Sequence, residues 1–352
     1  MSDAPEPHLT RSALCVALSL ALTGCGFIIP TWGNAGNSRP RNDPRLPSGV
    51  QAISFLGDTL RTMPLERETR RRYEQQLAEA RAAYERAPAD ADSIIWYGRR
   101  TAYLGHFREA IEIYTRGVSL HPYDARLYRH RGHRYISVRE LNNAIVDLER
   151  AARLTEGRPD QVEPDGQPNA QNRPIGTLRS NVYYHLGLAH YLRGDFSRAI
   201  PIYRRELQFA SNDDRRVSVA HWYYMSLRRL GRAIEATQFL RPFRRDMDVI
   251  ENQAYHRLLL MYKGELPADS VLADDMGERP TVQDVTTAYG VANWHLYNGR
   301  RGEAERLFRQ ILASRQWGAF GYIAAEAELA RMTGVRTATP GPPPVAPVWR
   351  AP

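Results

Sequence analysis

The chain has 352 residues with a formal net charge of +9, and 43% of its residues are hydrophobic, a composition ordinary for a folded body. Of its 48 basic residues only Lys263 is a lysine. Arginine alternates with glutamate along the expected helices, as in Arg108-Glu109 and Arg205-Glu206, so much of the charge belongs to solvated helix faces. No DNA- or RNA-binding module is visible, and we expect no nucleic-acid partner.

The first 24 residues have the features of a secretory signal peptide. Ser12–Leu22 is an apolar run that is too short to span a bilayer, which needs about 20 residues. Leu22-Thr23-Gly24-Cys25 follows directly and resembles the bacterial lipobox, in which the cysteine is lipidated and becomes the mature N-terminus. This resemblance implies an exported protein anchored to a membrane by acyl chains on Cys25. Gly26, in place of an aspartate, implies the outer membrane, facing the periplasm.

An incidental cysteine behind a leader is the alternative, because Asp3 and Glu6 offset the positive charge of Arg11. The chain has only one other cysteine, Cys15, which would leave with the leader. The mature body would then have no thiol for catalysis or metal binding.

Residues 25–65 are rich in Pro, Gly, Asn and Ser, a composition that forms no core, and we expect a flexible tether. Within it, Gln51–Leu60 has enough apolar residues to dock on the body as a short element. Residues 66–90 are expected to form an N-terminal cap helix with an arginine-rich face, which is either solvated or in contact with anionic lipid headgroups. That face carries Arg67, Arg70, Arg71, Arg72 and Arg81.

A pair of helices is expected over Ala91–Asp124. Gly98 and Ala110 are small residues placed where two helices would cross, and Leu104-Gly105 supplies the turn. Pro122 then ends the second helix.

The pattern returns 34 residues later, where Gly98 maps to Gly132 and Ala110 to Ala144. This period and these residue types resemble the tetratricopeptide repeat. The resemblance implies an all-α fold, a right-handed superhelical solenoid of helix-turn-helix units, with a flexible N-terminal tether and a Pro-rich C-terminal tail.

The units divide the chain as follows. Units 1–2 cover 91–158, and units 3–6 cover 178–316 with the fifth unit degenerate. Residues 159–177 are a Pro-rich insertion, which is either an ordered loop that shapes or covers the groove or an exposed linker. Residues 317–335 are expected to form a C-terminal cap helix, and 336–352 a disordered, polyproline-like tail.

In the tetratricopeptide family, first-helix residues that are not used for packing line a concave surface, which binds extended peptides or a partner's helix. The corresponding positions here are Arg99, Tyr103, Arg126, Arg129, His133, Tyr184, Tyr191, His221, Met225, Arg228, Arg229, Tyr289 and Asn293. Guanidinium groups match carboxylates, and aromatic residues with arginine dominate interface hot spots. We therefore expect a protein or peptide partner with acidic and apolar groups. The carboxylate clamp of chaperone-binding members is not supported, because Ile95 and Arg99 replace its Lys and Asn.

No catalytic site is predicted. His130 and His133 are three residues apart, with His185 and His190 farther along, but no His-Glu-x-x-His motif and no third ligand accompanies them. No cofactor fingerprint occurs either. We expect a non-enzymatic, membrane-anchored scaffold or adaptor of the bacterial cell envelope. The alternative is an envelope lipoprotein that captures nutrients or glycans, with Trp222, Trp294 and Trp317 as candidate platforms.

Overall fold

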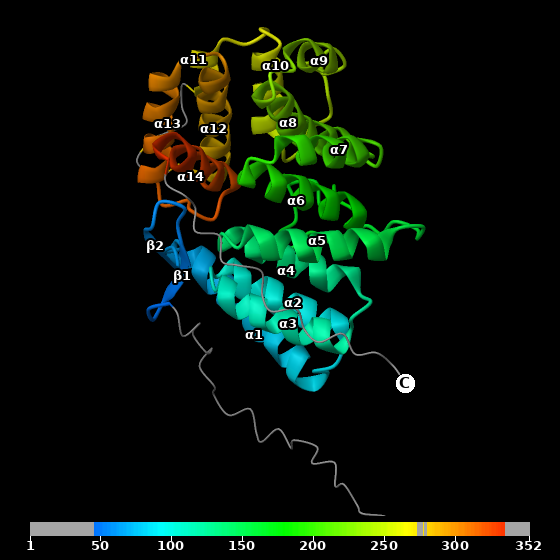
Figure 1. Ribbon diagram of the computed structural model, residues 1–352. Coiled ribbons are helices and arrows are strands. Elements are labelled where there is room, and N and C mark those ends of the chain that lie inside the picture. The colour runs from blue at the N-terminus through cyan, green and yellow to red at the C-terminus, as the bar shows by residue number, and fades with distance from the viewer. Residues whose placement is uncertain (1–45, 273–276, 278–279, 335–352) are drawn as a thin grey trace, which may run out of the picture. The chain divides into compact units, whose positions relative to one another are not determined.

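The computed structural model describes residues 46–272, 277 and 280–334, which form helices and one two-stranded sheet (Figure 1). The prediction of an all-α solenoid is confirmed, because consecutive helices pack in pairs and successive pairs stack on one another. The first helices of the first two pairs begin 34 residues apart, at Ala91 and Ala125. Residues 1–24, Cys25 and the tail 336–352 lie outside the described residues.

The helices are α1 (Arg67–Arg86), α2 (Ala91–Tyr103), α3 (Phe107–Leu120), α4 (Ala125–Ser137), α5 (Leu141–Thr155), α6 (Leu178–Arg193), α7 (Phe196–Leu207), α8 (Asp213–Arg229), α9 (Ala233–Phe239), α10 (Gln253–Tyr262), α11 (Ala268–Leu272), α12 (Val282–Tyr297), α13 (Arg301–Ala313) and α14 (Phe320–Thr333). The six pairs run from α2–α3 to α12–α13. In the fifth pair, α11 is short and follows Pro267, as expected of the degenerate unit.

Most first helices of the pairs begin at a polar cap. The Asp90 side chain accepts a hydrogen bond from the backbone N–H of Ser93 at 2.7 Å, which satisfies one of the free donors at the start of α2. The equivalent caps of α4, α6, α8 and α12 are Asp124, Thr177, Asn212 and Thr281. These short polar residues recur with the repeat, so the helix starts are encoded locally.

The turn inside each pair needs a residue with positive φ. Gly105 has φ 82° in the first unit, and the same position in the third to sixth units is a glycine. In the second unit this position is Arg139, with φ 68°. A non-glycine residue in this region is strained by about 1–2 kcal/mol, so Arg139 indicates an interaction that offsets the strain.

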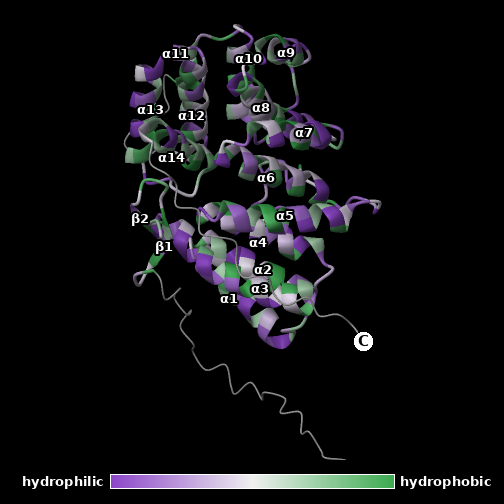
Figure 2. Ribbon diagram, viewed as in Figure 1, coloured by the Kyte–Doolittle hydropathy of each residue, from purple (hydrophilic) through white to green (hydrophobic). Residues whose placement is uncertain are grey.

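The small residues of the repeat bring paired helices close together. A Cβ atom on Gly98 would lie 2.5 Å from the Tyr114 ring, and one on Gly187 would lie 2.4 Å from the Tyr203 ring. Gly132 faces Leu148 in the same way. Figure 2 shows hydrophobic and hydrophilic residues alternating along these helices. The periodic glycines therefore mark helix crossings, as the sequence predicts.

A short hairpin precedes the helices. Strands β1 (Val50–Ile53) and β2 (Thr59–Arg61) pair antiparallel, and Ala52 and Leu60 are buried against the main core. The Trp317 indole donates to the Arg61 carbonyl at 2.8 Å. The expectation that Gln51–Leu60 docks on the body as a short element is therefore confirmed, and a flexible tether does not extend over 50–61. The partner of this element lies more than 250 residues away in the sequence.

The last helix, α14, is an interior element. Gly321–Ala330 are all buried, and α14 packs on α12, α13 and α6. A terminal cap would leave one face in water, so the prediction of a cap helix over 317–335 is wrong in this respect. The alanine-rich sequence suits burial on every side, and α14 thereby covers the inner side of later units.

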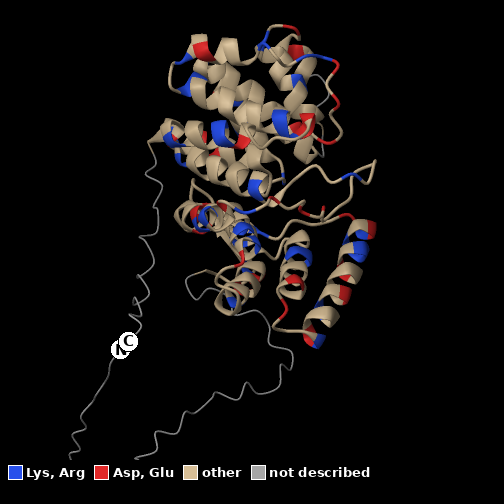
Figure 3. Ribbon diagram, turned by 90° about the vertical axis from the view of Figure 1, so that its right-hand side faces the viewer, with Lys and Arg blue, Asp and Glu red and all other residues tan. Residues whose placement is uncertain are grey.

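Helix α1 covers the other end, and none of its residues, all of which the structure describes, is buried. It packs on α2, where the Tyr84 and Tyr97 rings stack with centroids 5.1 Å apart. Basic and acidic side chains are interspersed over the helices (Figure 3). Among the described residues, no helix has the length and apolar character needed to cross a membrane.

Candidate functional site

The predicted groove residues on the later units lie in the interior. Tyr191, His221, Met225, Tyr289 and Asn293 each have 0% of their surface exposed. The Tyr191 and Tyr289 hydroxyls are 2.7 Å apart, and the Asn293 amide donates to Tyr191 at 3.2 Å.

Tyr184 is also buried, and its hydroxyl accepts a hydrogen bond from the Trp222 indole at 3.0 Å. The prediction that these six side chains line an open groove is therefore wrong. The repeat places them on the inner side, but packing by later helices and α14 buries that side.

Arg228 and Arg229 are half-buried and held within the chain. The Arg228 guanidinium donates to Asn298 at 2.9 Å and lies 4.2 Å from the Tyr297 ring centre. Arg229 pairs with Glu328 on α14. Charge reversal at these two positions would break internal contacts, so they are unsuitable for testing a partner site.

Arg126 lies at the outer edge, where it pairs with Asp124 and Asp92. It lines an open cavity of about 620 Å³ together with His121 and Asp160. This cavity lies where the ends of the first and second units meet the start of the insertion, and the inner-face residues discussed next are not among its lining.

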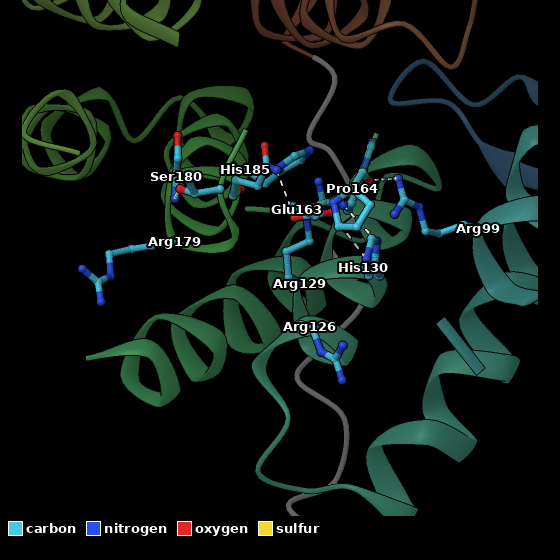
Figure 4. Close-up of polar contacts among 12 residues, drawn as sticks. Arg99, Arg126, Arg129, His130, Glu163, Pro164, Arg179, Ser180 and His185 are labelled. Carbon is cyan, nitrogen blue, oxygen red and sulfur yellow. Dashed lines mark hydrogen bonds and ion pairs between the residues drawn. The ribbon is translucent and has the colours of Figure 1, made fainter. Parts of the chain in front are cut away.

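The remaining predicted residues, Arg99, Tyr103, Arg129 and His133, lie on α2 and α4 near the Pro-rich insertion. We call residues Glu163–Gly166 of this insertion the strap, and the side chains that contact it, Arg99, Arg100, Tyr103, Arg129, His130 and Asn181, the cradle (Figure 4). Of the two alternatives for the insertion, the structure has the ordered loop that covers the inner face.

The glutamate of the strap meets three cradle side chains. One Glu163 oxygen lies 3.1 Å from Arg129 Nε and forms an ion pair that is not aligned for a hydrogen bond. The same oxygen accepts a hydrogen bond from the Asn181 amide at 3.0 Å. The other oxygen lies 3.5 Å from His130 Nε2. Arg129 and His130 point toward Glu163 from α4, as Figure 4 shows. The cradle thus binds a carboxylate.

Two further arginines bind the backbone of the strap. Arg99 donates to the Pro164 carbonyl at 2.9 Å, and Arg100 donates to the Gly166 carbonyl at 2.8 Å. A Cβ atom on Gly166 would lie 1.5 Å from the Tyr103 hydroxyl oxygen, so a larger residue there requires the Tyr103 side chain or the strap to move. The cradle therefore contacts an extended peptide at both its side chain and its main chain.

The N-terminal end of the strap is held by a short antiparallel pairing within the insertion. Val162 and Thr177 form an isolated bridge, and the Glu163 N–H donates to the Gly176 carbonyl at 3.0 Å. Val162 itself is 66% exposed, so this pairing positions the strap without adding to the core.

The charge of the cradle comes from arginine. Burial, together with the charge of Arg129, lowers the pKa of His130 and His185 well below its usual range, and burial with Arg134 does the same for His133. Burial lowers the pKa of Arg134 to about 10, so it stays charged at neutral pH. The histidines are therefore neutral at pH 7, so the positive charge that faces Glu163 comes from Arg129.

The histidines considered as metal ligands and the tryptophans considered as glycan platforms make contacts within the chain. His133 and His185 have ring centres 4.3 Å apart, but the described residues hold no group of three or more His, Cys, Asp or Glu placed to bind a metal ion. Of the predicted glycan platforms, Trp222 and Trp317 are buried, and Arg300 covers the Trp294 ring at 4.2 Å.

Arg100, Asn181 and Glu163 are site residues that sequence reasoning did not place in the groove. The acidic Glu163-Pro-Asp-Gly166 segment, beside arginine-rich helices, is the signal that could have found the strap. The sequence pattern assigns His130 no binding role, whereas in the structure it faces Glu163.

No family model matches the chain, and no curated protein matches it. A tetratricopeptide repeat protein from Parabacteroides merdae is similar at 15% identity and a TM-score of 0.42, over 72% of this chain and 92% of its own. MamA is similar at 16% identity and a TM-score of 0.39, over 58% and 100% of the two chains. YrrB, described as a tetratricopeptide repeat protein with an unusual peptide-binding site, is similar at 15% identity and a TM-score of 0.38, over 72% and 97%. These likenesses are too distant for a ligand or partner to be carried over.

Proposed function

We propose that this protein is a membrane-anchored interaction scaffold of the bacterial cell envelope, and that its cradle binds an acidic, extended segment of a protein partner. One observation carries the proposal: side chains from α2, α4 and α6 converge on a carboxylate and two peptide carbonyls of the strap. This combination recognises peptide main chain and acidic side chain together.

The physical basis is charge-assisted hydrogen bonding by arginine, whose planar guanidinium group suits carboxylates and carbonyls. A hydrogen bond to a charged group contributes about 1.5–3 kcal/mol, whereas micromolar affinity needs about 8 kcal/mol. The two hydrogen bonds from Arg99 and Arg100 together contribute about 3–6 kcal/mol and so fall short of micromolar binding. Apolar contacts with Tyr103 and its neighbour Tyr73, whose ring centres are 5.9 Å apart, would supply more. This is why a partner with both acidic and apolar groups suits the site.

The membrane anchor in this proposal rests on Cys25 and the apolar run before it. Acyl chains on Cys25, most simply in the outer membrane facing the periplasm, confine the solenoid to a surface. Confinement raises the effective concentration of partners that share that surface. Cys25→Ser is expected to move the protein from the membrane fraction to the soluble fraction, and unchanged membrane association would refute the anchor.

Site-specific photo-cross-linking tests the binding site. A photoreactive phenylalanine at position 73 lies beside the cradle, and one at position 146 on α5, where Val146 is 60% exposed, is the matched control. We expect a discrete cross-linked partner at 73 that is absent at 146. The double variant Arg99→Ala, Arg100→Ala should lose this adduct while keeping its helical circular dichroism. Cross-links that are identical at both positions, or unaffected by the double variant, would rule out the cradle as the binding site for this partner.

A further inference from the structure

We propose that the strap is a built-in competitor for the cradle, and that the partner segment it imitates has a glutamate followed three residues later by glycine. This inference rests on the proposed function of the cradle. It adds the sequence chemistry of the ligand and the way in which the site is regulated.

The spacing of the contacts defines the ligand. Glu163 supplies the carboxylate for Arg129, His130 and Asn181. The carbonyls one and three residues later, of Pro164 and Gly166, accept from Arg99 and Arg100. A competing segment therefore needs an acidic residue and then an extended main chain that presents the same two carbonyls.

Tyr103 adds a size restriction. Any side chain at the position of Gly166 would place its Cβ 1.5 Å from the Tyr103 hydroxyl oxygen, and 2.7 Å from an Arg99 nitrogen. Asp165, which lies between Pro164 and Gly166, makes no hydrogen bond or ion pair with the cradle among the described residues, and burial together with Glu251 raises the pKa of its carboxyl. We therefore expect glycine to be required and the residue before it to be free to vary.

The strap is held by polar contacts and buries little apolar surface. Val162 is exposed, Pro164 is exposed, and Gly166 is the one strap residue that is buried. Release of the strap would uncover no large hydrophobic side chain of the insertion itself, whereas it would leave the arginines of the cradle without their carboxylate. The site is therefore suited to exchange of one acidic segment for another.

Competition of this kind lowers the apparent affinity for a partner. The apparent dissociation constant equals the intrinsic one divided by the fraction of molecules whose cradle is free. A tethered segment has an effective local concentration in the millimolar range, so a partner at lower concentration must bind more tightly than the strap does or act together with a second contact. A variant with the strap expelled should bind the same segment tenfold more tightly or better.

The test uses the full-length protein and a fluorescein-labelled nonapeptide with the sequence of residues 160–168, DQVEPDGQP, with binding measured by fluorescence anisotropy. Gly166→Ala is expected to expel the strap, because its Cβ would overlap the Tyr103 hydroxyl, and it substitutes no residue of the cradle. Gln167→Ala, at an exposed position, is the matched control. We expect Gly166→Ala to bind the peptide at least tenfold more tightly than the wild type and the Gln167→Ala control. Equal affinity in all three proteins would overturn the inference.

Peptide variants test the chemistry of the ligand. Replacing the peptide glutamate with glutamine, or its glycine with alanine, should abolish the gain, whereas replacing the aspartate with asparagine should leave it intact. Binding that ignores the glutamate or the glycine would overturn the inference. Glu163→Gln in the protein is a second release variant, and it should also raise the affinity for the unmodified peptide.

The two proposals fail in different ways. If Gly166→Ala binds the peptide as expected but cross-linking at position 73 captures no partner, the competitor role of the strap is supported and the scaffold function is refuted. The opposite result is a partner whose capture depends on Arg99 and Arg100, while Gly166→Ala changes neither that capture nor the affinity for the peptide. In that case the scaffold function is supported and the competitor role of the strap is refuted.

Discussion

Replacing Glu326 with alanine removes a carboxylate that joins three distant parts of the chain. Glu326 on α14 pairs with Arg139 in the turn of the second unit, with 2.7 Å between Arg139 Nη2 and Glu326 Oε2. The same carboxylate accepts from the Phe55 N–H of the hairpin at 2.6 Å. The two side chains are only 3% and 1% exposed. We expect Glu326→Ala to weaken the closure between α14, the hairpin and the second unit.

The size of the effect follows from burial. Removing one partner of a buried ion pair costs about 3–5 kcal/mol, because the other charge stays buried without compensation. Arg139→Gly should lower the free energy of unfolding by about 1–2 kcal/mol less than loss of a buried arginine from an unstrained position would. The reason is that glycine relieves the strain of φ 68°. The double variant Arg139→Gly, Glu326→Ala leaves neither charge behind. We therefore expect its loss in unfolding free energy to be about 2–3 kcal/mol smaller than the sum of the losses of the two single variants.

Urea denaturation followed by circular dichroism gives the free energies of unfolding for the four proteins of this cycle. Hydrogen exchange of the α14 amides shows whether the loss is local, and we expect faster exchange there in Glu326→Ala. A loss below about 1 kcal/mol for Glu326→Ala, or strictly additive effects in the double variant, would refute the role of this pair.

Two further predictions concern the core. Burial lowers the pKa of His221 to about 3. Below about pH 6.5 the unfolded chain takes up a proton at this histidine and the folded chain does not. The contribution of neutral His221 to the free energy of unfolding is therefore complete above that pH and falls as the pH is lowered. At pH 5 the loss is about 2 kcal/mol. Between pH 7 and pH 5 the unfolding free energy of His221→Leu should therefore drop by about 2 kcal/mol less than that of the wild type. An equal drop in the two proteins would contradict this prediction. Gly187→Ala would press a Cβ to 2.4 Å from the Tyr203 ring and should destabilise by about 1–3 kcal/mol. Its matched control, Gly302→Ala in α13, meets nothing within 4 Å and should stabilise by about 0.5–1 kcal/mol in the same thermal melts; similar effects at both positions would contradict the crossing role.

Local rules were sufficient to predict the repeat. Gly98 and Gly132 recur at the helix crossings, and Asp90 and Asp124 recur as caps, so period and residue type together define the units. These features depend on neighbours within one or two helices. A single sequence displays such features directly.

Contacts between distant segments could not be predicted in the same way. Nothing in the alanine-rich sequence of α14 says that Glu326 reaches Arg139, 187 residues earlier. Because α14 returns over the inner side, residues such as Tyr191 and Tyr289 are in the core, although the repeat register assigned them to a groove. The one clue was Arg139 itself, which replaces the turn glycine of the other units.

The candidate site was predicted in part. Arg99, Tyr103 and Arg129 were assigned to the inner face from register, and the structure places them in the cradle. Their partner, Glu163, lies in an insertion without periodicity, so its position depends on how the loop folds back. Sequence reasoning therefore predicted the basic half of the contact and missed the acidic half.

Hydrogen exchange in the presence of a ligand tests the central claim most directly, namely that the cradle is a peptide site which the chain itself occupies. Full-length protein is compared with and without a saturating concentration of the unlabelled DQVEPDGQP peptide. We predict faster exchange across residues 162–177, including the Glu163 N–H that is now bonded to the Gly176 carbonyl, while α2 and α4 remain protected. Unchanged exchange of the insertion at peptide saturation would contradict the claim.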